Sequence, residues 1–152
     1  MNLLTTVAEV HALAFSSEEL VNKEVITLSD ILEAETRFVR PILGDELFDA
    51  VANGAYPALR SDYLLPVVAA WSRYVVEPLL QQRCLECHTL SRSAADNEHL
   101  RVLMRQLRRR ASTLSRRLSD HLNVHKDEYA EYNPNTNPLN HCSIYGDIIQ
   151  VY

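Results

Sequence analysis

The sequence predicts an all-α protein, a helical bundle of four to five helices followed by an extended C-terminal tail. Only three glycines occur among the 152 residues, whereas strand-rich proteins and phosphate-cradling enzymes use glycine freely. Apolar residues recur at spacings of three and four along two long stretches, and capping pairs recur near the start. A chain of this length can bury a core as one domain.

Capping pairs predict the first helices, because each side chain of a pair satisfies a backbone N–H left free at a helix start. Three pairs have this spacing: Thr6 with Glu9, Ser16 with Glu19, and Thr27 with Asp30. The third pair opens a helix from Leu28 whose inward face is Ile31, Leu32, Glu35, Phe38, Val39 and Ile42. Pro41 disfavours α geometry at the residue before it, so we expect this helix to end at Arg40.

Gly44 predicts a break, after which Asp45 can cap a short helix to Ala52 that Asn53 and Gly54 close. Residues 55–61 are predicted to form a loop.

A strongly apolar helix is predicted from Asp62 to about Thr89, and we expect it to be the most buried element. Its seam is Leu64, Val68, Trp71, Val75 and Leu79. Pro66 is tolerable in the first turn, whereas Pro78 removes an interior hydrogen bond and should kink or split the helix. The predicted core combines Ile31, Phe38, Leu47, Val68, Trp71, Val75, Leu107 and Leu114.

The longest helix is predicted over residues 97–130, after a loop over 91–96 in which Ser93 or Asp96 can cap it. Its heptad-like seam is Leu100, Met104, Leu107, Ala111, Leu114, Leu118 and His121. Seven arginines lie mostly off the seam: Arg101, Arg105, Arg108, Arg109, Arg110, Arg116 and Arg117. Residues 100–119 contain no acid, so the rest of the chain has eight basic residues against twenty acidic ones, a net −12. This polarity suits oriented packing against neighbours, or a basic face near nucleic acid.

The C-terminal tail differs from the rest in composition. Residues 133–138, Asn-Pro-Asn-Thr-Asn-Pro, predict an extended or turning linker. The segment 144–152 is rich in β-branched and aromatic residues, as strands are, yet we identify no second strand to pair with it. The chain therefore divides into a helical domain, 1–131, and an extended arm, 132–152. We expect the arm to dock on another polypeptide, rather than fold back on its own helices, through Ile144, Tyr145, Ile148, Ile149, Val151 and Tyr152.

Two cysteines and a histidine form the sharpest chemical motif, Cys84-Leu85-Glu86-Cys87-His88. The spacing matches the attachment signature of c-type haem, and His141 or Cys142 could complete a four-ligand zinc site. Haem attachment normally follows export, and neither a secretory signal nor a membrane span is evident at the sequence level. The odd number of cysteines indicates reduced thiols in a cytosolic setting. We therefore expect no cofactor and no metal.

This expectation is testable on the purified protein. We predict that Cys84 and Cys87 are dispensable for function and bind no metal, because no second pair of ligands has the spacing of a zinc half-site. Metal analysis after dialysis against a weak chelator should find no zinc. Stoichiometric zinc retained through that dialysis would contradict the prediction.

Catalytic patterns are absent from the sequence. His121 and His125 have i, i+4 spacing, but Leu122 stands where the zinc proteases have glutamate, and we expect both histidines on a polar face. Carboxylate pairs such as Glu33 with Glu35 are expected by chance among twenty acids. The sequence has no phosphate-binding loop, dinucleotide fingerprint or nucleophile elbow. We expect a protein that is not an enzyme.

The run Ile31 to Phe48, with its Pro41-Ile42-Leu43-Gly44 turn, resembles the first helices of head–tail connector, or adaptor, proteins of tailed bacteriophages and prophages. The resemblance extends through residues 24–131 in pattern more than in letters. It implies a virion protein, assembled in the host cytoplasm, that forms a ring of identical subunits, dodecameric in many members. Its implied partners are copies of itself, the portal protein, the next neck or tail protein, and the DNA that passes through.

An alternative interpretation is a small helical nucleic-acid-binding or regulatory protein that uses the arginine-rich helix 97–130. Arg108, Arg109 and Arg110 point about 100° apart, so they cannot form one DNA-reading edge. The helix also lacks the interleaved aromatic residues that stack on bases. We expect the arginines to supply charge at a subunit boundary or a channel lining instead.

Overall fold

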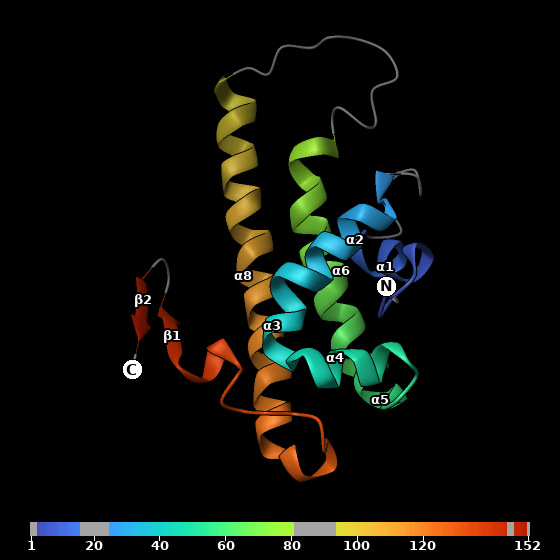
Figure 1. Ribbon diagram of the computed structural model, residues 1–152. Coiled ribbons are helices and arrows are strands. Elements are labelled where there is room, and N and C mark those ends of the chain that lie inside the picture. Colours follow the sequence, from blue (N-terminus) through green and yellow to red (C-terminus); the bar gives the residue numbers. More distant parts are fainter. Residues whose placement is uncertain (1–2, 16–24, 81–93, 146–147, 152) are drawn as a thin grey trace.

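The structure is a computed structural model that describes residues 3–15, 25–80, 94–145 and 148–151. The described chain is a helical bundle with a small C-terminal hairpin, which confirms the predicted fold class (Figure 1). Its α-helices and strands are α1 (Val7–Ala14), α2 (Leu28–Ala34), α3 (Arg40–Leu43), α4 (Asp45–Ala52), α5 (Pro57–Leu59), α6 (Leu65–Val76), α8 (Ala94–Val124), β1 (Cys142–Tyr145) and β2 (Ile148–Val151). Two π-helical segments are η2 (Glu35–Val39) and η3 (Arg60–Leu64), and 3₁₀ turns are η4 (Glu77–Leu79), η5 (Lys126–Glu128) and η6 (Pro138–Asn140).

Helix α6 forms the centre of the bundle and packs against α1, α2 and α8. Of the predicted core, Ile31, Leu47, Val68 and Trp71 are buried. The other four, Phe38, Val75, Leu107 and Leu114, are half-buried. The predicted face of α6 is therefore the one that meets its neighbours.

Two capping boxes form as predicted. Thr6 and Thr27 each accept a hydrogen bond from the backbone N–H three residues later, at the starts of α1 and α2. The acids Glu9 and Asp30 reciprocate by accepting from the backbone N–H of the capping threonine. The third pair, Ser16 with Glu19, lies outside the described residues.

The prediction that a helix ends at Arg40 is wrong. Arg40 has helical dihedral angles, φ −54° and ψ −40°, and the helix continues through Pro41 to Leu43. The preceding segment η2 is wound as a π-helix, in which the N–H of Arg40 donates to the carbonyl of Glu35. A proline normally clashes with the carbonyl four residues earlier, and the wider π-turn gives that carbonyl room.

The predicted loop over residues 55–61 is also wrong, because a helix begins within it. The helix already begins at Pro57, because proline is pre-organised for the first helical position and Tyr56 turns the chain with φ 53°. The π-helical η3 then precedes Pro66, as η2 precedes Pro41. Further along, α6 ends at Val76 and continues as the 3₁₀ turn η4 around Pro78, which confirms the predicted interruption.

Two helix ends differ from the sequence prediction. Gly44, with φ 79°, is the N-cap of α4, because the Asp45 carboxylate accepts from Arg40 Nε at 2.6 Å instead of capping. Helix α8 ends at Val124, short of the expected residue 130, and the chain turns back through η5. Tyr129 and Tyr132 are buried after this turn, so the returning chain packs on the bundle.

The segment 133–138 turns as predicted but lies against α8 instead of standing clear of the helices. Asn137 is fully buried, and its Nδ2 donates to Ser119 Oγ at 2.8 Å and to Tyr132 Oη at 2.9 Å. Asn140 and Asn123 exchange hydrogen bonds between their side chains. These amide contacts fix residues 132–141 to the second half of the long helix.

The expectation of a strand without a partner in its own chain is wrong. Strands β1 and β2 form an antiparallel hairpin, in which Cys142 pairs with Val151 and Tyr145 pairs with Ile148. Figure 1 shows the hairpin on the outer side of α8, away from α1 to α6. The segment 144–152, predicted as one strand, therefore contains the last two residues of β1 and all of β2.

Candidate assembly and nucleic-acid surfaces

The arginine-rich face lies on α8, the longest helix of the described chain, with 31 residues. Six of its seven arginines are exposed and one, Arg116, is half-buried. The steps of four and three residues from Arg101 to Arg105 and Arg108 place these three on one side of the helix. Arg110 lies on the opposite side, beside α1 and α6. The seven arginines therefore do not form a single face: Arg101, Arg105 and Arg108 form one stripe, and Arg110 faces the bundle.

The partners of these arginines differ along the helix. Arg101 and Arg105 approach Glu98, which lies one and two turns earlier, at 3.7 and 3.9 Å. At the other end, Arg116 donates to the carbonyl of Leu139 at 3.5 Å, and Arg117 lies over the Tyr63 ring at 5.5 Å. In the described part of the chain, no acid pairs with Arg108, Arg109 or Arg110. These three guanidinium groups are available to a ligand or a neighbouring molecule.

The C-terminal hairpin is a second candidate surface. Among the described residues its two strands pair only with each other. The backbone N–H and C=O groups on the outer edges can therefore pair with another chain. An isolated two-stranded hairpin is marginally stable in water, so an additional strand would stabilise it. Of the predicted arm residues, five lie in β1 or β2, and Tyr152 lies outside the described residues.

A buried carboxylate, on the face that the sequence predicted to point inward but without a predicted role, fastens the N-terminal segment. Glu35 is fully buried and accepts from the backbone N–H of Leu4 at 3.0 Å and from Thr5 Oγ1 at 2.9 Å. Arg60 completes the network by donating to the Leu4 carbonyl at 2.7 Å and to both oxygens of Glu9. The donors to Glu35 lie 30 and 31 residues away in sequence, so no local pattern could reveal this role.

Burial raises the pKa of Glu35 above its usual value of 4.5, although the hydrogen bonds from Leu4 and Thr5 oppose the shift. A raised pKa in the folded state means that folding takes up a proton, so the stability from this group is present below pH 4.5 and is lost as the pH rises through the folded pKa. We predict that Glu35→Gln becomes progressively more stable relative to wild type as the pH rises from about 4 to about 8. Its amide oxygen can still accept one hydrogen bond, and the Thr5 hydroxyl can accept from its NH₂ group.

Urea denaturation across this pH range measures the effect. The matched control is Glu33→Gln, an exposed neighbour on the same helix that pairs with Arg37 at 3.3 Å. Its stability difference from wild type should stay small, because an exposed ion pair contributes little to stability. Identical pH profiles for the two variants would show that Glu35 titrates as a surface group.

His121, near the end of α8, stands in an aromatic cluster and not on a solvated polar face. His121 is half-buried, stacks on Tyr63 with ring centroids 4.0 Å apart, and has Nε2 2.9 Å from Tyr129 Oη. Burial, with a contribution from His125, lowers the pKa of His121 below 6.5. In the described ranges, no group of three or more histidine, cysteine or acidic side chains could hold a metal ion. Cys84, Cys87 and His88 lie outside these ranges.

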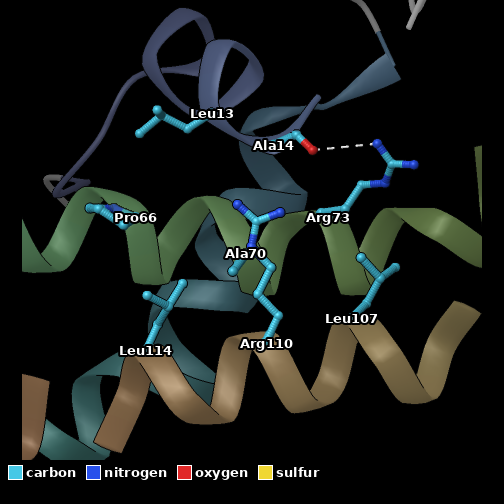
Figure 2. A pocket seen from close by; sticks show the side chains of 8 residues that line it. All are labelled: Leu13, Ala14, Pro66, Ala70, Arg73, Leu107, Arg110 and Leu114. Atoms are coloured by element: carbon cyan, nitrogen blue, oxygen red, sulfur yellow. Dashed lines mark hydrogen bonds between the residues drawn. The ribbon is translucent and has the colours of Figure 1, made fainter. Parts of the chain in front are cut away.

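A groove lies between α1, α6 and α8, with a volume of about 140 Å³ (Figure 2). Its lining is mainly apolar and includes two arginines: Leu13, Ala14, Pro66, Ala70, Arg73, Leu107, Arg110 and Leu114. Arg110 is visible in the sequence as part of the arginine run, but its place in a groove is not, because that place depends on how α1 packs on α6.

Comparisons with known proteins add no relative: no model of a protein family, no curated protein and no solved structure matches this chain. Among the described helices, none is long and apolar enough to cross a membrane.

Proposed function

We propose that this chain is a structural virion protein of a tailed bacteriophage or prophage, without enzymatic activity, that forms a ring at the head–tail junction. Three features support the proposal. The run 31–48, which resembles connector proteins, folds as one continuous helix, a glycine break and a second helix. The hairpin offers unpaired strand edges. The observation that carries the proposal furthest is the set of exposed arginines without acidic partners in the described chain.

Such cations suit a ring through which DNA passes. A phosphate backbone is attracted to guanidinium groups whatever the base sequence. Arginines facing a channel would therefore neutralise phosphate charge on the passing DNA without binding one particular sequence. The portal protein and the next neck or tail protein would contact the ring from either side, in the virion and during its assembly in the host cytoplasm. The decisive experiment is the mass of the purified protein in solution, alone and mixed with its portal. A monomer in both samples would overturn the proposal.

The exposed arginine stripe also favours a second candidate, a nucleic-acid-binding or regulatory protein that uses α8. The two proposed functions predict different preferences for DNA sequence. A ring protein should bind duplex DNA weakly and independently of sequence, whereas a regulator should prefer one sequence at moderate salt.

We predict that any affinity for duplex DNA falls steeply with salt and ignores sequence. Replacing Arg108 and Arg109 by glutamine should reduce the slope of log affinity against log salt by about 1 for each phosphate that is no longer neutralised. Fluorescence anisotropy with two unrelated duplexes measures both effects.

The matched control is Arg37→Gln, which removes an exposed arginine of η2 paired with Glu33. It should leave the salt slope unchanged. A preference of one duplex over the other by a factor of about a hundred or more would support the regulator instead.

A further inference from the structure

The chain reverses direction after α8, and a histidine fastens the start of the returning chain. Helix α8 ends at Val124, and η5 turns the chain back (Figure 1). Tyr129, the residue after η5, is buried and lies edge-on to Tyr56, with ring centroids 5.1 Å apart. Its hydroxyl is 2.9 Å from His121 Nε2, and it makes no other hydrogen bond within the described chain. A titratable side chain therefore holds the turn in place.

The hydrogen bond between His121 and Tyr129 depends on the protonation state of the imidazole. Because the Tyr129 hydroxyl has no other acceptor among the described residues, we assign the O–H as donor and the neutral Nε2 as acceptor. A protonated Nε2 can no longer accept, so the hydroxyl proton loses its acceptor. A buried polar group without a partner destabilises the arrangement that buries it. Protonation of His121 therefore favours a turn in which Tyr129 reaches water.

The charges nearest to His121 also disfavour its protonated form. Arg117 and His125 stand one turn to either side of it on α8, and the rings of His121 and His125 are 4.5 Å apart. Arg117 lies over the ring of Tyr63, on which His121 stacks. Like charges one turn apart on a helix repel each other. Glu128 of η5 attracts a protonated His121, but it is already engaged by His125 Nδ1 at 2.9 Å.

The remaining ionisable groups on the elements around His121 are engaged elsewhere or exposed. Arg60 of η3 donates to Glu9, and Glu131 accepts from Tyr56 Oη at 2.7 Å. Three acids and one lysine are exposed: Asp62, Asp120, Asp127 and Lys126.

Burial, followed by the charge of His125, lowers the pKa of His121 below 6.5, while Glu128 acts in the opposite direction. Because the pKa is lower in the closed turn, opening the turn takes up a proton. The closed turn is therefore fully favoured above pH 6.5 and loses this advantage as the pH falls toward the lowered pKa.

We propose that His121 is a pH-sensitive latch for the turn after α8. Its neutral ring holds Tyr129 in place, and its protonation in mildly acid solution opens residues 125–131. The latch acts within one chain, so it does not depend on the proposed ring.

The opening is local, because the chain beyond the turn is held by groups that do not titrate in mild acid. Tyr132 donates to Asn123 Oδ1 at 2.9 Å, and Asn137 donates to Ser119 Oγ at 2.8 Å. These contacts keep residues 132–141 on α8 when the turn opens.

Hydrogen exchange of the full chain, followed by mass spectrometry and corrected for the intrinsic rate at each pH, tests the latch. Between about pH 7.5 and about pH 5, the amides of residues 125–131 should lose protection, by about tenfold for each pKa unit that separates the open turn from the closed one. The amides of α6 should keep their protection.

Three variants assign the effect to His121. His121→Gln keeps an acceptor for Tyr129 at every pH, so its protection should change less than about twofold over this range. The matched control, His99→Gln, removes an exposed histidine of the same helix and should behave as wild type. His125→Gln removes the neighbouring charge, so the loss of protection should begin at a higher pH.

Full protection of the wild-type turn at about pH 5, or equal losses in wild type and His121→Gln, would overturn the latch. An equal loss in α6 would show that acid unfolds the whole bundle, and would overturn it too. Nuclear magnetic resonance of the wild-type His121 ring gives a readout that needs no variant. Its titration should have a midpoint below 6.5 that coincides with the loss of protection, and a midpoint at or above 6.5 would contradict the proposal.

Discussion

Replacing Trp71 by alanine should lower the free energy of unfolding by about 3–5 kcal/mol, the range found for large aromatic side chains removed from a core. Trp71 is 7% exposed and stacks on Phe38, with ring centroids 3.8 Å apart and planes inclined by 5°. Tyr74 meets the same ring edge-on at 5.6 Å. The indole also joins α6 to α8, because its Nε1 donates to Ser115 Oγ at 2.9 Å.

Urea denaturation followed by circular dichroism measures this destabilisation. The variant Trp71→Phe separates packing from hydrogen bonding, since it keeps an aromatic ring but leaves the buried Ser115 hydroxyl without its donor, at a cost of about 1–3 kcal/mol. A decrease below about 1 kcal/mol for Trp71→Ala would mean that α6 does not present this face to α2 and α8.

Local sequence signals predicted the elements whose causes are local. The boxes Thr6–Glu9 and Thr27–Asp30 marked the starts of α1 and α2, because a capping box needs only four consecutive residues. The apolar seams of α6 and α8 indicated their inward faces for the same reason. Prolines misled the prediction at η2 and η3, since a π-turn that accommodates a proline depends on how the whole helix packs.

The candidate surfaces were predictable only in part. The arginine run is visible in the sequence, but the lack of acidic partners for Arg108 to Arg110 among the described residues depends on which helices pack beside α8. The hairpin had a local signal that the prediction of an unpaired strand overlooked: Gly146-Asp147 separates two short β-branched and aromatic runs, and Gly-Asp is a typical two-residue hairpin connection. The role of Glu35 had no local sequence signal, because its hydrogen-bond donors come from another segment of the chain.

Truncation after His141 should abolish ring formation while leaving helical content and thermal stability nearly unchanged. The truncation removes β1 and β2, which lie on the outer side of α8 (Figure 1), and keeps the amide contacts of residues 132–140. The bundle keeps all of its described core side chains. The strand edges that would pair with a neighbouring chain are removed with the hairpin. Size-exclusion chromatography with light scattering measures assembly, and circular dichroism measures stability.

A shorter chain ending at Glu131 is the matched control for stability. It also removes Tyr132 and Asn137, two buried residues whose side chains hydrogen-bond to each other and, through Asn137, to Ser119. Because buried side chains and their hydrogen bonds are lost, this chain should melt clearly earlier than the one ending at His141. Early melting of both chains would show that the hairpin stabilises its own helices. Normal ring formation by the chain ending at His141 would show that the hairpin edges play no part in assembly.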